Sequence, residues 1–417
     1  MFVIRRAKIE DVPTLLKLAR MVHFINLPAD KDILTEKTQW SRQCFLLAGE
    51  SVEGLGSHAG TVADSPEHRA ESTAFASGLR ALTGRSPLFM FVMEDTESAS
   101  VVGTSQLIAA MGGPGRPNLS WQLSRREMFS QSLQIGTSHV TARLHLDESG
   151  PTELGGLILQ PSARGHRQKL GAFLSLVRFH FIGLHRGMFA DRVLAELMAP
   201  MDGGGQNHFW EYFSRRFINL TYDEADRFCQ HSKEFMLNLL PREEIYLTLL
   251  PPEARAVVGQ VGPETAPAKR MLEKLGFAYH NRIDPFDGGP NLEADTDSIS
   301  MVRATDRATL GAPMSAAPAR RTPGFVSVML DDGDFRCVRA EFGRDRRGRV
   351  QLARADMDAL AAEPGMPVGV TDLTLTEFGP GRTPAPATKP IPAATSRARS
   401  ARPPRRRGGA RERGAGA

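Results

Sequence analysis

The sequence has few cysteines, few Trp and Tyr residues, and no long apolar run. Its 417 residues include three Cys, three Trp and four Tyr. Three cysteines, odd in number and far apart, fit neither a disulfide framework nor a zinc site. No run reaches the roughly 18 apolar residues that a membrane-spanning helix needs. The first residues, MFVIRRAKIEDVP, carry charges where a signal peptide requires apolar side chains. We therefore expect a reduced, cytoplasmic protein that uses no metal and no membrane.

The net positive charge of the chain comes from its C-terminal end. Residues 381–417 hold nine Arg, Lys389 and one acid, Glu412, which gives a net charge of +9. The other 380 residues carry 42 basic and 46 acidic side chains, a net charge of −4. The sequence pI of about 9.3 therefore describes a tail and not the body of the protein. Nucleic acid is expected to bind, if at all, only weakly and through this tail.

What is present is typical of a globular α/β protein. Hydrophobic residues make up 41% of the chain and charged residues 24%, and the length allows two or three packed units. Strand-like runs alternate with amphipathic segments through residues 1–290, which predicts an α/β body with a mixed sheet. We expect a body over 1–300 with a surface insertion at about 50–86, a linker at 301–323, a small β-rich unit at 324–378 and a disordered basic tail at 379–417.

Individual elements follow from the hydrophobic period and from turn residues. Residues 88–110 predict a hairpin around an acidic turn, whereas residues 112–150 give only scattered strand signals. The other expected strands are 152–161, 192–200 and 256–261, and the expected helices are 170–184, 208–217 and 266–275.

One of these turns has the composition of an anion site. The strand at 152–161 is followed by RGHRQKLG and then by an amphipathic helix. Free N–H groups and the dipole at a helix N-terminus attract a pyrophosphate. Gly165 and Gly171 relieve crowding there, and Arg164 and Arg167 add positive charge. A solvated strand–helix turn would explain the same residues.

The whole pattern resembles the arginine N-succinyltransferase family, which belongs to the GNAT superfamily of acyl-CoA-dependent N-acyltransferases. The matching stretches occur in order: NLPA (26–29), FVMED (91–95), TELGGLILQP (152–161), FADRVLAE (189–196), FWEYFSRRF (209–217), VVGQV (257–261) and IDPFDGGPNLEA (283–294). The resemblance implies a GNAT-like fold and transfer of succinyl from succinyl-CoA to the α-amino group of arginine or ornithine. It also makes a homo- or hetero-oligomer with a related subunit possible.

The resemblance also suggests where the substrates bind. It puts the CoA contact of the core strand at Leu157, flanked by Ile158 and Leu159, with the phosphates on the turn residues Arg164, Gly165, Arg167 and Gly171. Paired carboxylates suit a guanidinium, so Glu196 and Asp202 are candidate arginine ligands. The backbone angles that glycine allows are sufficient to explain the Asp287-Gly288-Gly289-Pro290 turn. We expect this turn to act in the fold first and in the site second.

The residue that would protonate the departing thiolate is not identified by the sequence. The family has a His in a GQV-His-Pro sequence, where this chain has Gly262. Weaker substitutes are His208, His280 and Tyr246. This leaves two main hypotheses, an active arginine N-succinyltransferase or a non-catalytic homologue that serves as a partner subunit or binds arginine or acyl-CoA. A nucleic-acid-binding protein acting through its tail is a third hypothesis from another class.

Overall fold

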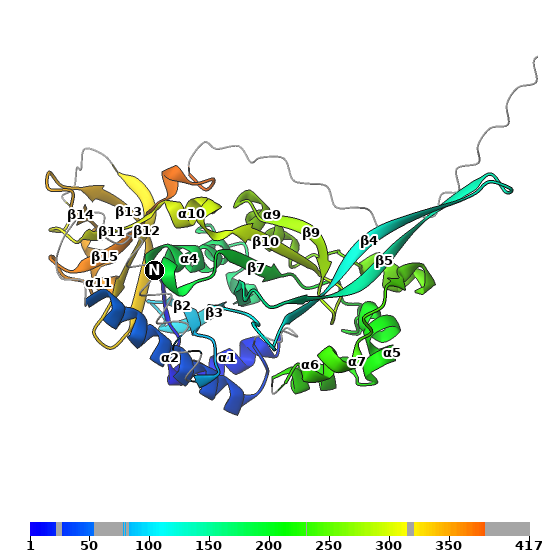
Figure 1. Cartoon of the computed structure of the whole chain (residues 1–417). Helices are drawn as coiled ribbons and strands as arrows, with labels where there is room; N and C mark the ends of the chain where they lie inside the picture. The colour runs from blue at the N-terminus through cyan, green and yellow to red at the C-terminus, as the bar shows by residue number, and fades with distance from the viewer. Residues whose placement is uncertain are drawn as a thin grey trace, which may run out of the picture.

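Nearly all strands of the protein join in one large mixed sheet. The computed structural model describes residues 1–21, 27–53, 78, 80, 83–230, 232–314 and 321–379. The sheet order is β11-β15-β12-β13-β1-β2-β3-β6-β7-β10-β9-β4-β5-β8, with β14 beside β13 (Figure 1). The expected mixed α/β fold is confirmed. The proposed insertion falls largely on residues 54–77 and the proposed tail on residues 380–417, both outside the described residues.

The centre of the sheet holds the elements that the sequence indicates most clearly. Its strands are β1 (Phe2–Arg6), β2 (Leu88–Asp95), β3 (Ser100–Ile108), β6 (Thr152–Leu159), β7 (Arg192–Glu196), β10 (Pro290–Asp295) and β9 (Ala278–Ile283). The helices around it are α1 (Val12–Ala19), α2 (Lys31–Glu53), α4 (Leu170–Leu184), α9 (Ala266–Lys274) and α10 (Ser300–Arg303). The hairpin, the strands at 152–161 and 192–200, and the helices after them are thus confirmed.

Alternation along β2 defines the two faces of this sheet. Met90 and Val92 pack in one apolar cluster with α1, and Phe89 and Phe91 pack in another with α4. Because opposite residues of paired strands share a face, the register assigns the side chains of β3, β6, β7 and β10 to these faces. We call them the α1 face and the α4 face.

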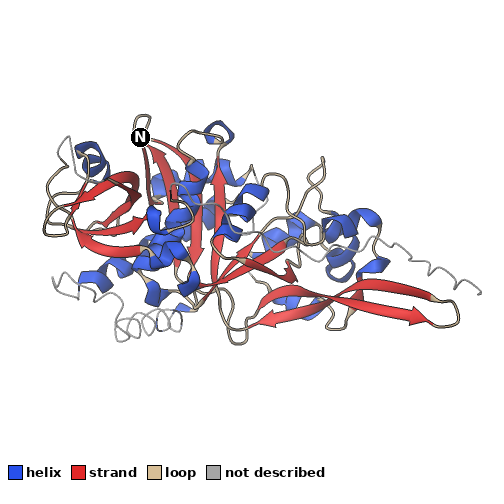
Figure 2. Ribbon diagram, turned by 90° about the horizontal axis from the view of Figure 1, so that it is seen from above, coloured by secondary structure: helices blue, strands red, loops and turns tan. Residues whose placement is uncertain are grey.

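A second, smaller core supports a long hairpin. β4 (Asn118–Ser130) and β5 (Ile135–Asp147) pair over their whole length. Only Trp121 and Gln122 of β4 pair with β9, and only Thr141 and Ala142 of β5 pair with β8 (Ile245–Tyr246). Beyond these pairs the hairpin projects from the body as an arm (Figures 1 and 2). Four large apolar side chains near its tip are exposed: Met128, Phe129, Leu133 and Ile135.

Short helices pack under the base of this arm. They are a π-helical turn (Trp210–Ser214), α5 (Arg215–Ile218), α6 (Tyr222–Cys229), α7 (Glu234–Leu239) and α8 (Pro252–Val257). The strand expected at 256–261 is wrong, since α8 runs to Val257 and a turn with Gly259 at φ +66° follows. Pro252 opens this helix in its first turn, a position that proline favours. Figure 1 shows α6 and α7 on the same side of the sheet as α1 and α2.

The C-terminal strands extend the sheet of the body. They are β11 (Thr305–Thr309), β12 (Thr322–Met329), β13 (Phe335–Arg344), β14 (Val350–Gln351) and β15 (Pro367–Asp372), with α11 (Arg354–Leu360) beside them. β13 pairs with β1 through Ile4↔Cys337 and Arg5↔Arg336. The segment expected as a linker contains β11, which pairs with β15. The division into domains itself stays a prediction.

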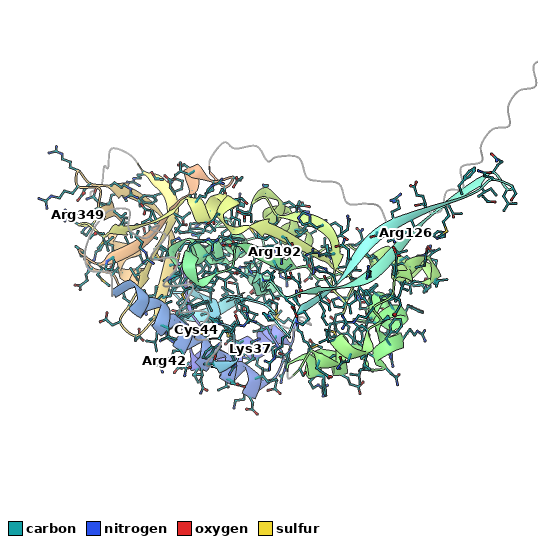
Figure 3. All side chains as sticks on the ribbon, viewed as in Figure 1. Lys37, Arg42, Cys44, Arg126, Arg192 and Arg349 are labelled. Carbon is teal, nitrogen blue, oxygen red and sulfur yellow. The ribbon has the colours of Figure 1, made fainter. Side chains whose placement is uncertain are left out.

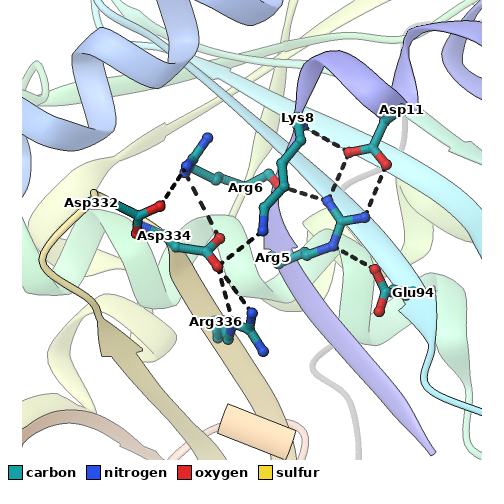
Figure 4. Close-up of polar contacts among 8 residues, drawn as sticks. All are labelled: Arg5, Arg6, Lys8, Asp11, Glu94, Asp332, Asp334 and Arg336. Carbon is teal, nitrogen blue, oxygen red and sulfur yellow. Dashed lines mark hydrogen bonds and ion pairs between the residues drawn. The ribbon is translucent and has the colours of Figure 1, made fainter. Parts of the chain in front are cut away.

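Ion pairs join β1 to the turn before β13 (Figure 4). Arg6 donates to Asp332 at 3.2 Å, and Lys8 and Arg336 both reach Asp334 at 3.2 and 3.1 Å. The Arg6 and Asp334 side chains are only 6% and 5% exposed. This network fastens the first strand to strands that follow it by more than 300 residues.

Among the described helices, none is long and apolar enough to cross a membrane.

Candidate functional site

The two central parallel strands separate soon after they pair. β6 and β7 match only at Thr152↔Val193 and Glu153↔Leu194. Beyond this point β6 follows β3 with a register shift, and Gly156 has φ +55°. A bulge of this kind bends a strand away from its neighbour. The backbone of β6 after Glu153 therefore has no ladder partner on the β7 side, which opens a gap between the two strands.

The predicted CoA-contact residues lie along and after this gap. Leu157 and Leu159 are half-buried, and Ile158 is buried against the α1 cluster. The turn that follows ends at α4, and Gly165 and Lys169 adopt φ +72° and φ +51° in it. Arg164, Gly165 and Arg167 are exposed on this turn, and Gly171 lies in the first turn of α4. The structure thus gathers these residues at one helix N-terminus, and CoA binding there stays a prediction.

Gly262 lies beside the chain that leaves β7. Its N–H donates to the carbonyl of Met198 at 3.2 Å. A Cβ at this position would be 3.6 Å from the Ala199 carbonyl oxygen and 3.7 Å from Pro200 Cα, which is ordinary contact. Arg164 forms an ion pair with Glu264 at 3.3 Å, so the turn before α4 and the segment of Gly262 are neighbours. A side chain at position 262 would fit at the open end of the strand gap.

The three suggested substitutes for the missing His are scattered. His280 is exposed on β9, where its carbonyl accepts a bond from Gln122. Tyr246 is on β8, with its ring 5.7 Å from that of His139 on the arm. His208 is half-buried in the loop after β7, with Nε2 3.9 Å from Asp202. The structure brings His208 and Asp202 together but does not join them to Tyr246.

Asp202 is occupied by its own loop. Its Oδ1 accepts N–H bonds from Gly204 and Gln206, both at 2.8 Å. These bonds, that from Gln206 first, lower the pKa of the Asp202 carboxyl. Glu196 is different, because it ends β7 on the α1 face and accepts a bond from Asn118 at 3.2 Å. Of the two suggested arginine ligands, only Glu196 lies in the sheet at the strand gap.

A row of polar side chains crosses the α1 face around Glu196. By register it contains Gln106 on β3, Glu153 on β6, Glu196 on β7 and Asn291 on β10, four adjacent strands. Gln106 and Glu153 are 0% exposed and Asn291 is 2% exposed. Buried polar groups cost free energy unless they are bonded, so such a row in an otherwise apolar layer points to a binding surface.

Two lysines lie close to the carboxylates of this row. Burial alone would lower the pKa of Lys233, just before α7, but the charges of Glu196 and Glu153 outweigh it and raise that pKa. Burial lowers the pKa of Lys37 on α2 to about 8, although the charge of Glu153 opposes the shift. Figure 3 labels Lys37 on the flank of α2 toward α6 and α7. The sequence did not single out either lysine, because neither belongs to a matched motif.

Two aspartates follow β9. Burial raises the pKa of Asp287 to about 6, and burial with the charges of Glu196 and Asp287 raises that of Asp284 well above its ordinary value. Asp287 also accepts N–H bonds from Ala199 and Gly289. The turn thus holds the chain that leaves β7, as its expected structural role requires. No group of three or more His, Cys, Asp and Glu side chains in the described part of the chain could hold a metal ion.

The gap and the row together suit a cationic amino acid placed beside a thioester. Carboxylates can receive a guanidinium or ammonium group, and a lysine can receive a carboxylate. Backbone N–H groups of a strand that has lost its neighbour can bind a carbonyl oxygen on which negative charge develops. Such a site performs acyl transfer by positioning and by hydrogen bonds, without a nucleophilic side chain.

Comparisons with known proteins agree with this chemistry. The profile of a family described as arginine N-succinyltransferase beta subunit matches residues 46–301. An arginine N-succinyltransferase of Citrobacter koseri is 34% identical over 293 residues, which cover 69% of this chain and 83% of that protein. One of Yersinia pestis is 39% identical over 223 residues, which cover 53% of this chain and 63% of the relative's length.

A solved structure extends the match to most of the chain. Arginine/ornithine succinyltransferase subunit AI from Pseudomonas aeruginosa is 25% identical, with a TM-score of 0.67 over 89% of this chain and 99% of that chain. The match therefore includes more than the 46–301 stretch, and the C-terminal strands are part of the shared fold.

Proposed function

Because the chain belongs to the arginine N-succinyltransferase family, we propose that it transfers a succinyl group from succinyl-CoA to the α-amino group of arginine or ornithine. The observation that carries the proposal is the polar row on the α1 face, which meets the gap between β6 and β7 at Glu153. An acceptor with a cationic side chain matches the carboxylates of this row, and a thioester matches the backbone of the gap.

The row differs along its length. Gln106 is enclosed beside the bulge of β6, whereas Glu196, which pairs with Asn291 of β10, is half-buried near Asp284 and Asp287. We place the α-amino group at the Gln106 end, next to the thioester, and the cationic side chain at the acidic end. The α-carboxylate would then pair with Lys37 or Lys233. This orientation puts each charged group of the acceptor beside a group of opposite charge.

The CoA part would follow the route that the family resemblance suggests. Its thioester oxygen would meet N–H groups of β6 near Leu157, and its phosphates would meet the turn of Arg164, Gly165 and Arg167 and the first turn of α4. The body is mildly acidic overall, so these local arginines supply the positive charge that phosphates require.

Loss of an acid at position 262 does not prevent such a reaction. The neutral amine attacks the thioester carbon, the C–S bond breaks and CoA leaves as a thiolate, and the proton that the nitrogen loses passes to water or to that thiolate. A thiol has a pKa of about 8.5, so its anion is a stable leaving group near neutral pH. Positioning of the two reactants supplies a large part of the barrier reduction. A Gly262→His variant should then be faster, because an acid next to the sulfur helps it leave.

The test is release of free thiol from succinyl-CoA with and without an acceptor. Arginine and ornithine should each be compared with citrulline, which keeps the length of arginine but has no charge. We expect release that depends on arginine or ornithine, little with citrulline, and a several-fold increase in Gly262→His. Gly136→His on the arm, where a Cβ meets only ordinary contacts, is the matched control and should equal the unmodified chain.

Absence of acceptor-dependent release would reject catalysis. Tight binding of succinyl-CoA or arginine by calorimetry in that case would favour the alternative, a binding protein or the partner of an active subunit. If citrulline served as well as arginine, the assignment of the acidic end of the row would be wrong.

A further inference from the structure

Gln106 is a fully buried side chain whose two polar atoms have no hydrogen-bond partner among the described residues. It is 0% exposed, and neither Nε2 nor Oε1 makes a hydrogen bond to any atom of the described residues. A buried amide without partners destabilises a fold, and leucine of nearly the same size would pack there without that penalty. The position is therefore poorly explained by packing, and both atoms have unused hydrogen-bonding capacity.

The side chain lies against the bulge that separates β6 from β7. Gln106 pairs with Gly155 in the β3–β6 ladder, and the register shifts next to that pair. A Cβ at Gly156 would be 2.8 Å from Gln106 Nε2 and 2.9 Å from its Cδ. The amide thus occupies the space that any larger residue at position 156 would need. Glycine at position 156 therefore allows both the positive φ angle of the backbone and the close approach of the Gln106 amide.

The opposite face of the bulge is held by an arginine. Arg178 of α4 is 3% exposed, and it donates to the Gly155 carbonyl at 3.4 Å and to Ser175 Oγ at 2.6 Å. Its guanidinium reaches the bulge from the α4 side, and Gln106 faces the bulge from the α1 side. Gln106 is thus the neutral polar group at the end of the row that borders the bulge.

From this geometry we infer that Gln106 contacts the acyl acceptor, with Oε1 accepting a hydrogen bond from the attacking α-amino group. The inference rests on the proposed function and adds a residue to it. An amine that attacks a carbonyl must be uncharged, with its lone pair directed at the carbon. A hydrogen bond from one of its N–H groups to a fixed amide oxygen orients that lone pair.

A neutral amide suits this role better than a carboxylate. A carboxylate next to the amine would stabilise the ammonium form, which cannot attack. The same face carries the charged groups Glu153 on β6 and Glu196 on β7, and Lys37 on α2 and Lys233 before α7 interact with these carboxylates, while Arg178 lies behind the bulge. These charged groups remain the same in every variant of Gln106. A change in the kinetics of such a variant therefore reports the effect of residue 106 on the amine.

Two substitutions separate a contact with the acceptor from a structural role. Gln106→Leu keeps the volume and removes both unpaired atoms. We expect its thermal unfolding midpoint to equal or exceed that of the unmodified chain, and its kcat/KM for the acceptor to fall at least about tenfold while KM for succinyl-CoA stays unchanged. Gln106→Glu should move the acidic limb of the kcat/KM profile toward higher pH, because more hydroxide is then needed to free the amine.

Gln39→Glu on the exposed surface of α2 is the control for added charge and should leave the pH profile unchanged. If Gln106→Leu kept full acceptor kinetics, or if Gln106→Glu left the profile in place, the inference would be overturned. Calorimetry of arginine in the presence of desulfo-CoA gives a readout without turnover. Arginine binding that is equal in the unmodified chain and in Gln106→Leu overturns the inference, whereas failure of the unmodified chain to bind arginine instead rejects the proposed function.

Discussion

At the scale of single residues, the three cysteines are buried thiols. Cys44 and Cys337 are 0% exposed and Cys229 is 8% exposed. Burial raises the pKa of the Cys44 and Cys229 thiols to about 12. Because the thiolate is the reactive form, we expect fewer than about 0.2 thiols per chain to react with an aromatic disulfide reagent within minutes in the folded protein. All three should react in guanidinium chloride, and fast labelling of the folded chain would contradict the packing.

Lys37 gives a prediction on pH. Burial lowers its pKa to about 8, below the ordinary value of 10.5. Burial opposes the ammonium form in the folded chain, so this group destabilises the fold below pH 8. The cost disappears as the pH rises from 8 to 10.5. Lys37→Met should therefore raise the unfolding midpoint at pH 7 and leave it nearly unchanged at pH 10.5. An equal effect at both pH values would mean that Lys37 has an ordinary pKa.

Sequence reasoning found one member of the polar row and missed the rest. Glu196 could be identified because it is a carboxylate within an expected apolar strand, belongs to a matched motif and can pair with a guanidinium. Gln106 and Glu153 are each one of several polar residues in their own strands. Nothing in the neighbouring sequence reveals that their side chains share a face of the sheet. Lys233 comes from a short helical segment. Their proximity depends on the order of strands in the sheet, which sequence period does not encode.

At the scale of elements, the turn before β10 is fixed by close contacts. A Cβ at Gly289 would lie 1.9 Å from the Leu197 carbonyl oxygen and 2.9 Å from the Ala199 amide nitrogen. Both neighbours are backbone atoms and cannot move aside alone. We expect Gly289→Ala to lower the free energy of unfolding by about 2–4 kcal/mol in urea titrations. Gly203→Ala, where a Cβ meets no atom within 4 Å, should change it by less than about 0.5 kcal/mol.

Elements with one buried face were predictable, and the arm was not. The sequences of β6, α4 and α9 show either the hydrophobic periodicity of an element with one buried face or clear turn residues at its ends. The sequence therefore predicts their positions correctly. Outer residues of β4, such as Met128 and Phe129, are exposed in a ribbon that pairs with no other described strand there. Such strands have no inward face, so polar and apolar residues do not alternate. The arm therefore appeared only as scattered strand signals.

At the scale of the whole molecule, the C-terminal strands are part of the body's sheet. A chain that ends at Arg303 would leave β1 as an open edge and would deprive the buried Arg6 of Asp332 and Asp334. We expect this truncation to be insoluble or to lack a cooperative unfolding transition. A chain that ends at Gly379 should unfold at the same temperature as the full chain. A soluble, cooperatively folded 1–303 fragment would show that the body is independent.

The pairing of β1 with β13 also sets an order for folding during synthesis. Ile4 and Cys337 are opposite each other in the sheet. At a translation rate of about 5–20 residues per second, roughly 20–70 s separate their emergence from the ribosome. During that time the outer edge of β1 has no strand to pair with. A nascent chain that is released early, or that waits for its last quarter, thus presents this edge to chaperones and to other chains.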